Sequence, residues 1–183
     1  MWLRKRQAVF GNNNPVELDL GCGDGGFLVA YSAAHPERNF LGTERLMGRI
    51  CKIIKRRYAL GLRNVKVGRV ESGYFLKYMV RPHSLRAIHL YFPDPWPKKK
   101  HARHRLVQAE FAASCRNAIA PDGGVYLRTD NVEYYAQMRE VFAAEKGLLE
   151  METPEELKAF QTDFERQWLA QGLRTNYAAY RLA

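Results

Sequence analysis

Long apolar runs, cysteine pairs and internal repeats are all missing from this chain of 183 residues. No run approaches the length needed to cross a bilayer, so we expect no membrane-spanning segment. The three cysteines, at 22, 51 and 115, are far apart and form no Cys-x-x-Cys pair. This excludes a disulfide framework and a zinc site, and it predicts a cytoplasmic protein with reduced thiols and no bound metal. Residues 1–6 are partly basic but precede no apolar core, so no signal peptide is expected.

Acidic residues are also in deficit, since 19 Asp and Glu face 29 Lys and Arg, for a formal net charge of +10. An excess of this size favours polyanionic partners. The basic residues gather in two places, whereas residues 140–165 carry eight acidic residues against two lysines. This asymmetry is typical of a docking face. One group is a stripe at helical spacing, Arg45, Arg49, Lys52 and Arg56, and the other is the loop run 98–105. We expect both to contact phosphates.

Apolar segments alternate with helical patterns in a βαβ rhythm, which predicts an α/β fold with a doubly wound, mostly parallel sheet in a three-layer sandwich. The whole chain, 1–183, reads as one domain. The expected strands are 16–20, 39–43, 65–70, 85–92, 125–129 and, as an edge strand, 177–182. The later helices are expected at 75–79, 106–120 and 132–144, with a turn at 121–124.

Ligands of such folds bind beyond the carboxyl ends of the strands, near the point where strand order reverses. The first strand runs into a glycine-rich loop, in which Gly21 and Gly23 permit a tight turn and close approach of a cofactor. Glu44, after the second strand, is placed to accept hydrogen bonds from ribose hydroxyls. With Gly26 the loop also fits a nicotinamide dinucleotide pattern, so the loop alone leaves two cofactors open. The short chain, and Asp19 placed to face an ammonium group, favour S-adenosylmethionine.

Glu71, just past the third strand, is placed either to reach an adenine or simply to start a helix. The fourth strand then runs into three prolines within five residues, which fix the backbone around Asp94. A carboxylate held beside Trp96 and a basic run predicts a base-binding pocket with a phosphate contact at its mouth. Trp96 either stacks on a base or packs in the fold. His101 and His104 lack a third ligand, so we do not expect them to bind a metal.

The segment 92–99, Phe-Pro-Asp-Pro-Trp-Pro-Lys-Lys, with the histidine at 101, resembles the signature of the tRNA (guanine-N7)-methyltransferases. The similarity continues over nearly the whole chain at 18–23, 42–44, 105–108, 129–131, 162–165 and 180–182. The sequence departs from the family pattern at Asp19, where Glu is usual, and at Glu71-Ser72, where Asp-Ala or Asn-Ala is usual. Leu173 also follows Gly172 where His is common.

This resemblance implies a Rossmann-like methyltransferase fold with a seven-stranded sheet. It implies methyl transfer from S-adenosylmethionine to N7 of a guanine in tRNA, in the variable loop, with tRNA as partner. The sequence leaves the oligomeric state, monomer or homodimer, open. The cofactor would contact Asp19, Gly21, Gly23, Glu44, Glu71 and Asp94, with Asp94 also catalytic. The guanosine would contact Lys98, Asp130, Thr162, Phe164 and Glu165.

Guanine N7 carries a free lone pair, so the reaction requires orientation and charge compensation, not a base. We expect Asp94, with Asp130 or Glu165, to accept hydrogen bonds from guanine N1–H and the exocyclic amine. A non-catalytic RNA-binding relative, suggested by the departures at Asp19 and Glu71, stays open, as do methylation of another RNA or of protein and a nicotinamide-dependent oxidoreductase.

Overall fold

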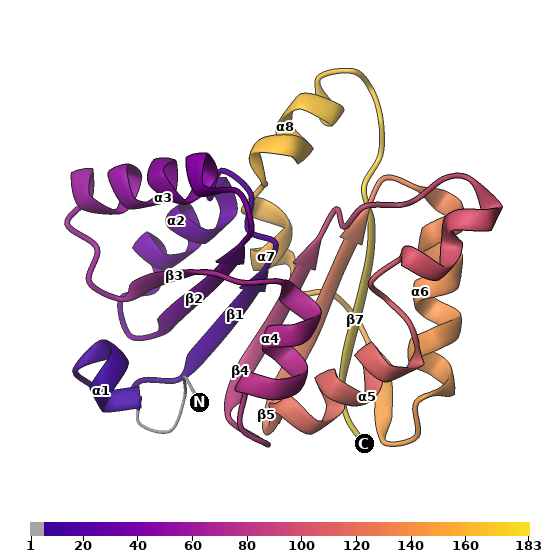
Figure 1. The fold of residues 1–183 in the computed structure, drawn as a ribbon, viewed down its shortest axis with the longest axis horizontal. Helices are drawn as coiled ribbons and strands as arrows, with labels where there is room; N and C mark the ends of the chain where they lie inside the picture. Colours follow the sequence, from indigo (N-terminus) through magenta and orange to yellow (C-terminus); the bar gives the residue numbers. More distant parts are fainter. Residues whose placement is uncertain (1–5) are drawn as a thin grey trace.

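A single seven-stranded sheet runs through the computed structural model, which describes residues 6–183, the side chains of 6, 7 and 99 excepted (Figure 1). The strand order is β3-β2-β1-β4-β5-β7-β6. The strands are β1 (Val16–Leu20), β2 (Asn39–Glu44), β3 (Val65–Arg69), β4 (Leu85–Tyr91), β5 (Ile119–Thr129), β6 (Leu148–Met151) and β7 (Asn176–Leu182). The first five are parallel, and β7 lies antiparallel between β5 and β6. The order reverses at β1, which confirms the doubly wound, mostly parallel sheet.

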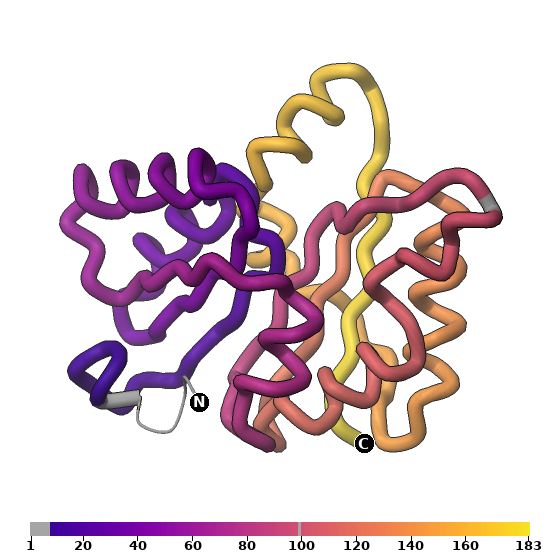
Figure 2. The backbone as a smooth tube through the Cα atoms, in the orientation of Figure 1, coloured from indigo at the N-terminus to yellow at the C-terminus, as the bar shows by residue number. Residues whose placement is uncertain are grey.

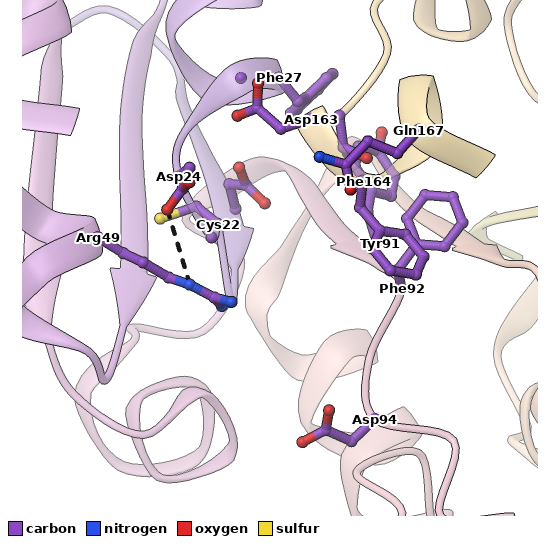
Figure 3. A pocket seen from close by; sticks show the side chains of 15 residues that line it. Cys22, Asp24, Phe27, Arg49, Tyr91, Phe92, Asp94, Asp163, Phe164 and Gln167 are labelled. Carbon is purple, nitrogen blue, oxygen red and sulfur yellow. Dashed lines mark ion pairs between the residues drawn. The ribbon is translucent and has the colours of Figure 1, made fainter. Parts of the chain in front are cut away.

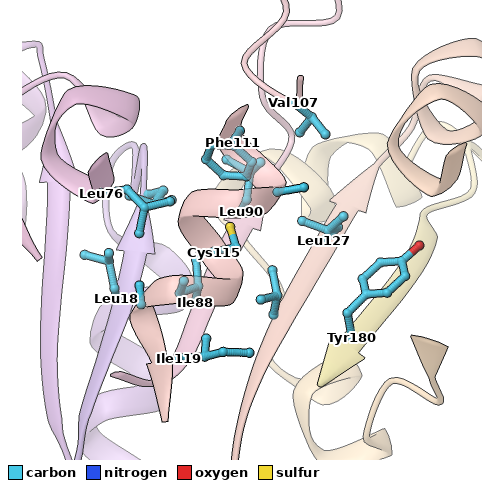
Figure 4. Packing of buried hydrophobic residues seen from close by; sticks show 14 of the residues in the cluster. Leu18, Leu76, Ile88, Leu90, Val107, Phe111, Cys115, Ile119, Leu127 and Tyr180 are labelled. Atoms are coloured by element: carbon cyan, nitrogen blue, oxygen red, sulfur yellow. The ribbon is translucent and has the colours of Figure 1, made fainter. Parts of the chain in front are cut away.

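Helices cover both faces of the sheet. The helices are α1 (Arg6–Phe10), α2 (Gly26–Ala34), α3 (Met47–Ala59), α4 (Ser72–Met79), the 3₁₀ helix η1 (Lys99–His104), α5 (Ala109–Ala118), α6 (Val132–Ala144), α7 (Glu155–Ala159) and α8 (Asp163–Leu169). One core lies between the sheet and α4, α5 and α6, where Leu18 and Leu127 share a cluster with Phe111 (Figure 4). A second core lies under α2, α3 and α7. The three-layer sandwich is therefore confirmed. Within the described part of the chain, no helix is both long and apolar enough to cross a membrane.

The central strand β1 is buried along its whole length although its residues alternate between apolar and acidic. Leu18 and its apolar neighbours face the α4–α6 core, while Glu17 lies on the α2 side of the sheet. There the Glu17 carboxylate contacts His89 Nε2 at 2.9 Å, and His89 Nδ1 contacts the Tyr91 hydroxyl at 2.8 Å. Burial opposes ionisation of Glu17, but His89 and Arg38 outweigh it and lower the carboxyl pKa. A satisfied polar network therefore lies beneath the carboxyl ends of β1 and β4.

Three expectations about individual helices and strands are wrong. Strand β5 begins at Ile119, so 121–124 is not a turn but a bulge in β5, where the register with β4 shifts between Leu85 and Ala87. The helix expected at 106–120 is only α5, because η1 and an extended segment precede it. Strand β7 is not an edge strand, since β6 pairs with its outer side. The expectation of no signal peptide concerns residues 1–5, which lie outside the described residues, and Arg6.

Arg128 anchors the C-terminal helices to the sheet. Its side chain is 1% exposed, and Nη1 donates to Glu165 Oε2 and to the Phe160 carbonyl, both at 2.8 Å. Nη2 donates to the Leu157 carbonyl, and the guanidinium lies 4.0 Å from the centre of the Tyr91 ring. One buried cation thus holds α7, α8 and the segment between them against β4 and β5.

Replacing Arg128 with Met should lower the free energy of unfolding by about 3–5 kcal/mol, because it leaves the Glu165 carboxylate buried without a partner. Urea denaturation measures this change. The matched control is Arg139→Met, which removes an exposed ion pair with Glu150 and should cost less than about 1 kcal/mol. Equal, small losses in the two variants would show that Arg128 is not an anchor.

Candidate active site

A cleft of about 390 Å³ opens beyond the carboxyl ends of β1 and β4, where the strand order reverses (Figure 3). Its walls come from the glycine-rich loop, the end of β4 and α8. The cleft is lined by Asp19, Gly21, Cys22, Gly23, Asp24, Gly26, Phe27, Arg49, Tyr91, Phe92, Asp94, Thr162, Asp163, Phe164 and Gln167. It continues into a neighbouring hollow bordered by Glu44, Glu71, Trp96 and His104, and Arg49 and Asp94 line both parts.

The glycine loop opens onto this cleft through backbone that other residues rarely adopt. Gly21 has φ 71° and Gly23 has φ 56°, both in the left-handed region. A Cβ built on Gly23 would meet no atom within 4 Å, so a ligand can approach its backbone closely. The Gly23 N–H donates to Glu44 Oε2 at 3.1 Å, which ties the loop to the end of β2. The loop is therefore fixed in an open shape that fits a cofactor.

Asp19 is a buried carboxyl group facing the cleft, and its side chain has no hydrogen-bond partner among the described residues. Burial raises its pKa to about 7, Arg128 opposes that shift and Glu44 adds to it. A carboxylate in this position is stabilised by any cation that enters the cleft. An ammonium group therefore fits the floor of this site.

Glu44 and Glu71, which border the continuation of the cleft, also accept hydrogen bonds from nearby backbone N–H groups. Glu44 Oε1 accepts the N–H groups of Arg45 at 2.6 Å and Leu46 at 2.9 Å. Glu71 accepts the N–H groups of Gly73 and Tyr74 and so caps α4. The helix-start interpretation of Glu71 is thus what the structure shows, while its side chain still borders the cleft.

Asp94 projects from a rigid loop after β4 toward the cleft that it shares with Arg49 (Figure 3). Phe92 and Trp96, on either side, have φ of 52° and 43°, which is strained for large residues. The loop is held because the Phe92 N–H donates to the Arg128 carbonyl at 2.8 Å. Buried Arg105 also donates to the Pro95 carbonyl at 2.7 Å. These contacts therefore decide where the backbone of Asp94 lies.

Trp96 packs against two histidines of η1, with ring centroids 5.3 Å from His104 and 5.9 Å from His101. The indole is 39% exposed and borders the cleft together with His104. The segment 98–105 therefore begins at the mouth of the cleft, as expected of a region that contacts phosphates, and Lys98 lies exposed at its start.

The structure brings together most of the expected site residues. Asp19, Gly21, Gly23, Glu44, Glu71, Asp94, Thr162 and Phe164 line the cleft or its continuation. Glu165 does not: it is fully buried, bonded to Arg128, and forms a capping box with Thr162 at the start of α8. Asp130 and Lys98 are also outside the set of lining residues.

Three residues of the basic stripe, which was expected to contact phosphates, also contact the glycine loop, and this was not expected. Lys52 Nζ lies 2.8 Å from Asp24 Oδ2, and Arg49 Nε lies 3.8 Å from Asp24 Oδ1. Arg56 Nη1 donates to the Asp24 carbonyl at 3.0 Å and to Asp163 Oδ2 at 2.9 Å. The signal that was missed is complementary charge, because Asp24 stands in the loop and Asp163 begins the helix above it.

Comparison with known proteins agrees with this geometry. The model of the Methyltransf_4 family, described as "Putative methyltransferase", matches residues 13–178. A tRNA (guanine-N(7)-)-methyltransferase of Geobacter metallireducens is 35% identical over 95% of this chain and 85% of its own length. One of Hydrogenovibrio crunogenus is 37% identical over 76% of this chain, which spans 58% of that protein. The crystal structure of an rRNA methylase from Streptococcus thermophilus, 14% identical, superposes with a TM-score of 0.61 over 96% of this chain and 90% of that one.

The doubly wound sheet with its cleft at this switch point is a Rossmann-like architecture, and the match to the family model over residues 13–178 makes the protein a methyltransferase of this fold. More narrowly, the chain belongs to the tRNA (guanine-N7-)-methyltransferase family, as its motifs indicated. The nicotinamide alternative is therefore set aside.

The Asp19→Asn variant should be more stable than the wild type above neutral pH. The folded-state pKa of about 7 lies above the ordinary value of 3.8, so ionisation of Asp19 destabilises the fold progressively as pH rises between these values. Each unit corresponds to about 1.4 kcal/mol, so the variant should gain roughly 2–4 kcal/mol at pH 8 and almost nothing at pH 4. Urea denaturation at both pH values tests this, and a gain that does not depend on pH would contradict it.

Proposed function

We propose that this enzyme transfers a methyl group from S-adenosylmethionine to N7 of a guanine in tRNA. The observation that carries the proposal is that two of the carboxylates lining this one cleft lie in different surroundings. Asp19 is buried and unpaired at the floor, and Asp94 is exposed on a rigid loop at the mouth. Family membership supplies the reaction class, and the basic charge of the chain suits a polyanionic substrate. Because tRNA is the proposed substrate, we also propose that the enzyme acts in the cytoplasm.

The residues of the cleft fit the parts of S-adenosylmethionine. Asp19 would hold the ammonium group of its methionine end, and Arg49, a cation on the same cleft, would hold the carboxylate. The open backbone at Gly21 and Gly23 leaves room for the chain of the cofactor. Glu44 and Glu71 border the continuation where ribose and adenine would lie. When bound, the cofactor supplies an electrophilic methyl group on a sulfonium.

Asp94 is proposed to orient the guanine. Its carboxylate would accept hydrogen bonds from N1–H and the exocyclic amine, which selects guanine over adenine and compensates for the positive charge that develops on the purine. Phe164 lies 5.0 Å from Phe92 between ring centroids and is 41% exposed, so the two rings offer an aromatic surface on which a base can stack. Thr162 lies beside them.

The remaining positions have weaker support. Glu165 is engaged by Arg128, so we propose that it places α8 and does not bind the base. Lys98 is proposed to contact a phosphate near the target. Asp130 lies after β5, close to the same edge of the sheet, and is proposed to help hold the tRNA. By resemblance to the family, the target guanine is proposed to lie in the variable loop.

Incubation with S-adenosylmethionine and an unmodified tRNA transcript should yield 7-methylguanosine, detected by nucleoside mass spectrometry. Asp94→Ala should reduce kcat by about 100-fold or more while changing cofactor affinity only a few-fold. Asp94→Asn, which keeps the size but loses the charge, separates the role of charge from that of packing. Equal losses in kcat and in cofactor affinity would rule out the proposed role of Asp94.

Affinity for tRNA should fall steeply with salt, because binding releases counterions from the RNA. Replacing Lys98 and Lys100 together with Ala should reduce the slope of log K against log salt by about 1–2. Lys146, exposed between α6 and β6, is the matched control, and its replacement should leave the slope unchanged. Identical slopes in the three proteins would place the phosphate contacts elsewhere.

A further inference from the structure

Two walls of the cofactor cleft are both bound by one side chain that lies outside the cleft. The glycine loop forms one wall and the first residues of α8 form the other (Figure 3). The backbone in Figure 2 shows that α8 begins beside the start of α2, although the two lie far apart in the sequence. Arg56, on α3, donates from Nη1 both to the Asp24 carbonyl in the loop and to Asp163 Oδ2 in α8. Arg56 itself is not one of the lining residues. It therefore acts on the cleft only through the two walls.

Asp163 is the point at which α8 meets the rest of the site. Its carboxylate also pairs with Arg166 on its own helix. It packs on the start of α2 so closely that a Cβ built on Gly26 would lie 2.6 Å from Asp163 Oδ2. Partial burial disfavours ionisation of Asp163, but the hydrogen bond from Arg56 and the nearby positive charges hold its pKa below the usual value. The contact thus joins α2, α3 and α8 at one carboxylate.

The Arg56–Asp163 pair is too exposed to matter much for stability, since the two side chains are 42% and 29% accessible. Its effect is to fix the position of α8 relative to the glycine loop. A cofactor in the cleft would lie between the two walls. Phe164, on the second wall, is 41% exposed and is therefore free to contact a second ligand. Whatever orders one wall also orders the other through Arg56. Binding at one wall therefore lowers the entropy cost of binding at the other.

We propose that Arg56 is a positioning residue that couples the glycine loop to α8, so that cofactor and tRNA bind cooperatively. The tRNA half of this inference rests on the proposed function. Because coupling is reciprocal, tRNA should tighten the binding of the cofactor by the factor by which the cofactor tightens the binding of tRNA.

The test compares Arg56→Gln, Asp163→Asn and the double variant with the wild type. Lys55→Gln is the matched control, because it removes the same charge from the adjacent, exposed position on α3. The Kd of S-adenosylhomocysteine is measured by calorimetry with and without saturating tRNA. In the wild type and in Lys55→Gln, tRNA should lower this Kd about fivefold or more. In Arg56→Gln and Asp163→Asn the Kd should rise severalfold and the effect of tRNA should largely vanish.

Two further readouts separate placement from simple loss of charge. The losses of the two single variants should not add up in the double variant, because each single substitution already breaks the Arg56–Asp163 contact. Arg56→Lys should restore only part of the coupling, since an ammonium does not reproduce the planar geometry of a guanidinium. The proposal is overturned if Arg56→Gln weakens tRNA binding as Lys55→Gln does while leaving the cofactor Kd and the coupling as in the wild type. Arg56 would then be a phosphate contact.

Hydrogen exchange of the α8 amides tests the bridge without RNA. Adding S-adenosylhomocysteine should slow exchange at 163–169 in the wild type and in Lys55→Gln, but not in Arg56→Gln. If the wild type binds no tRNA, the proposed function fails, and this measurement still decides whether Arg56 joins the walls. If α8 is protected equally in Arg56→Gln, the inference fails while the methyltransferase function is untouched. Thermal melts confirm that each variant is folded.

Discussion

The site depends on the contacts of one buried group, the guanidinium of Arg128. It lies on β5 with almost no exposure, and it binds a carboxylate and two carbonyls from the segment 157–165. A buried charge needs such partners, and the contacts of the cation add to the packing of Leu157 and Phe160 in the core under α2. The same group lies against the ring of Tyr91 and opposes the rise in the pKa of Asp19. One side chain thus sets the floor of the cleft, its wall and part of its electrostatics.

Much of the fold was readable because periodicity and turn chemistry agreed with it. Residues 16–20 and 132–144 were expected with the bounds that β1 and α6 have. The segment 121–124, Pro-Asp-Gly-Gly, was wrongly expected to be a turn, because its conformational preference suits a bulge inside a strand as well as a turn between elements. Strand β6 and helices α7 and α8 were missed since all are short and lie in a mostly acidic stretch. The Thr162–Glu165 capping box was present in the sequence but was interpreted only as a binding motif.

For the site, the rule that ligands bind beyond strand ends brought together residues from four separate segments. It could not show which polar groups are used up by the protein itself. Glu71 caps a helix and Glu165 neutralises a cation, and both facts depend on contacts far apart in the sequence or on local backbone geometry. Likewise, helical spacing located the face that carries Lys52 and Arg56, but only the fold shows that carboxylates of the chain lie opposite this face. Sequence located the cleft, and tertiary contacts divided its residues between binding and support.

The position of β7 has a consequence for how the enzyme is made. Its residues 176–182 enter the sheet between β5 and β6, so a strand that is synthesised after both of its neighbours fills an interior place. Before β7 is made, the nascent chain can pair β3, β2, β1, β4 and β5. The edge of β5 that later pairs with β7 then stays without a partner strand. The partners of Arg128 are also synthesised long after Arg128 itself. Synthesis therefore passes through a stage in which the glycine loop and Asp94 have been made but the cleft lacks its second wall, and the cleft is complete only after α8 has been made.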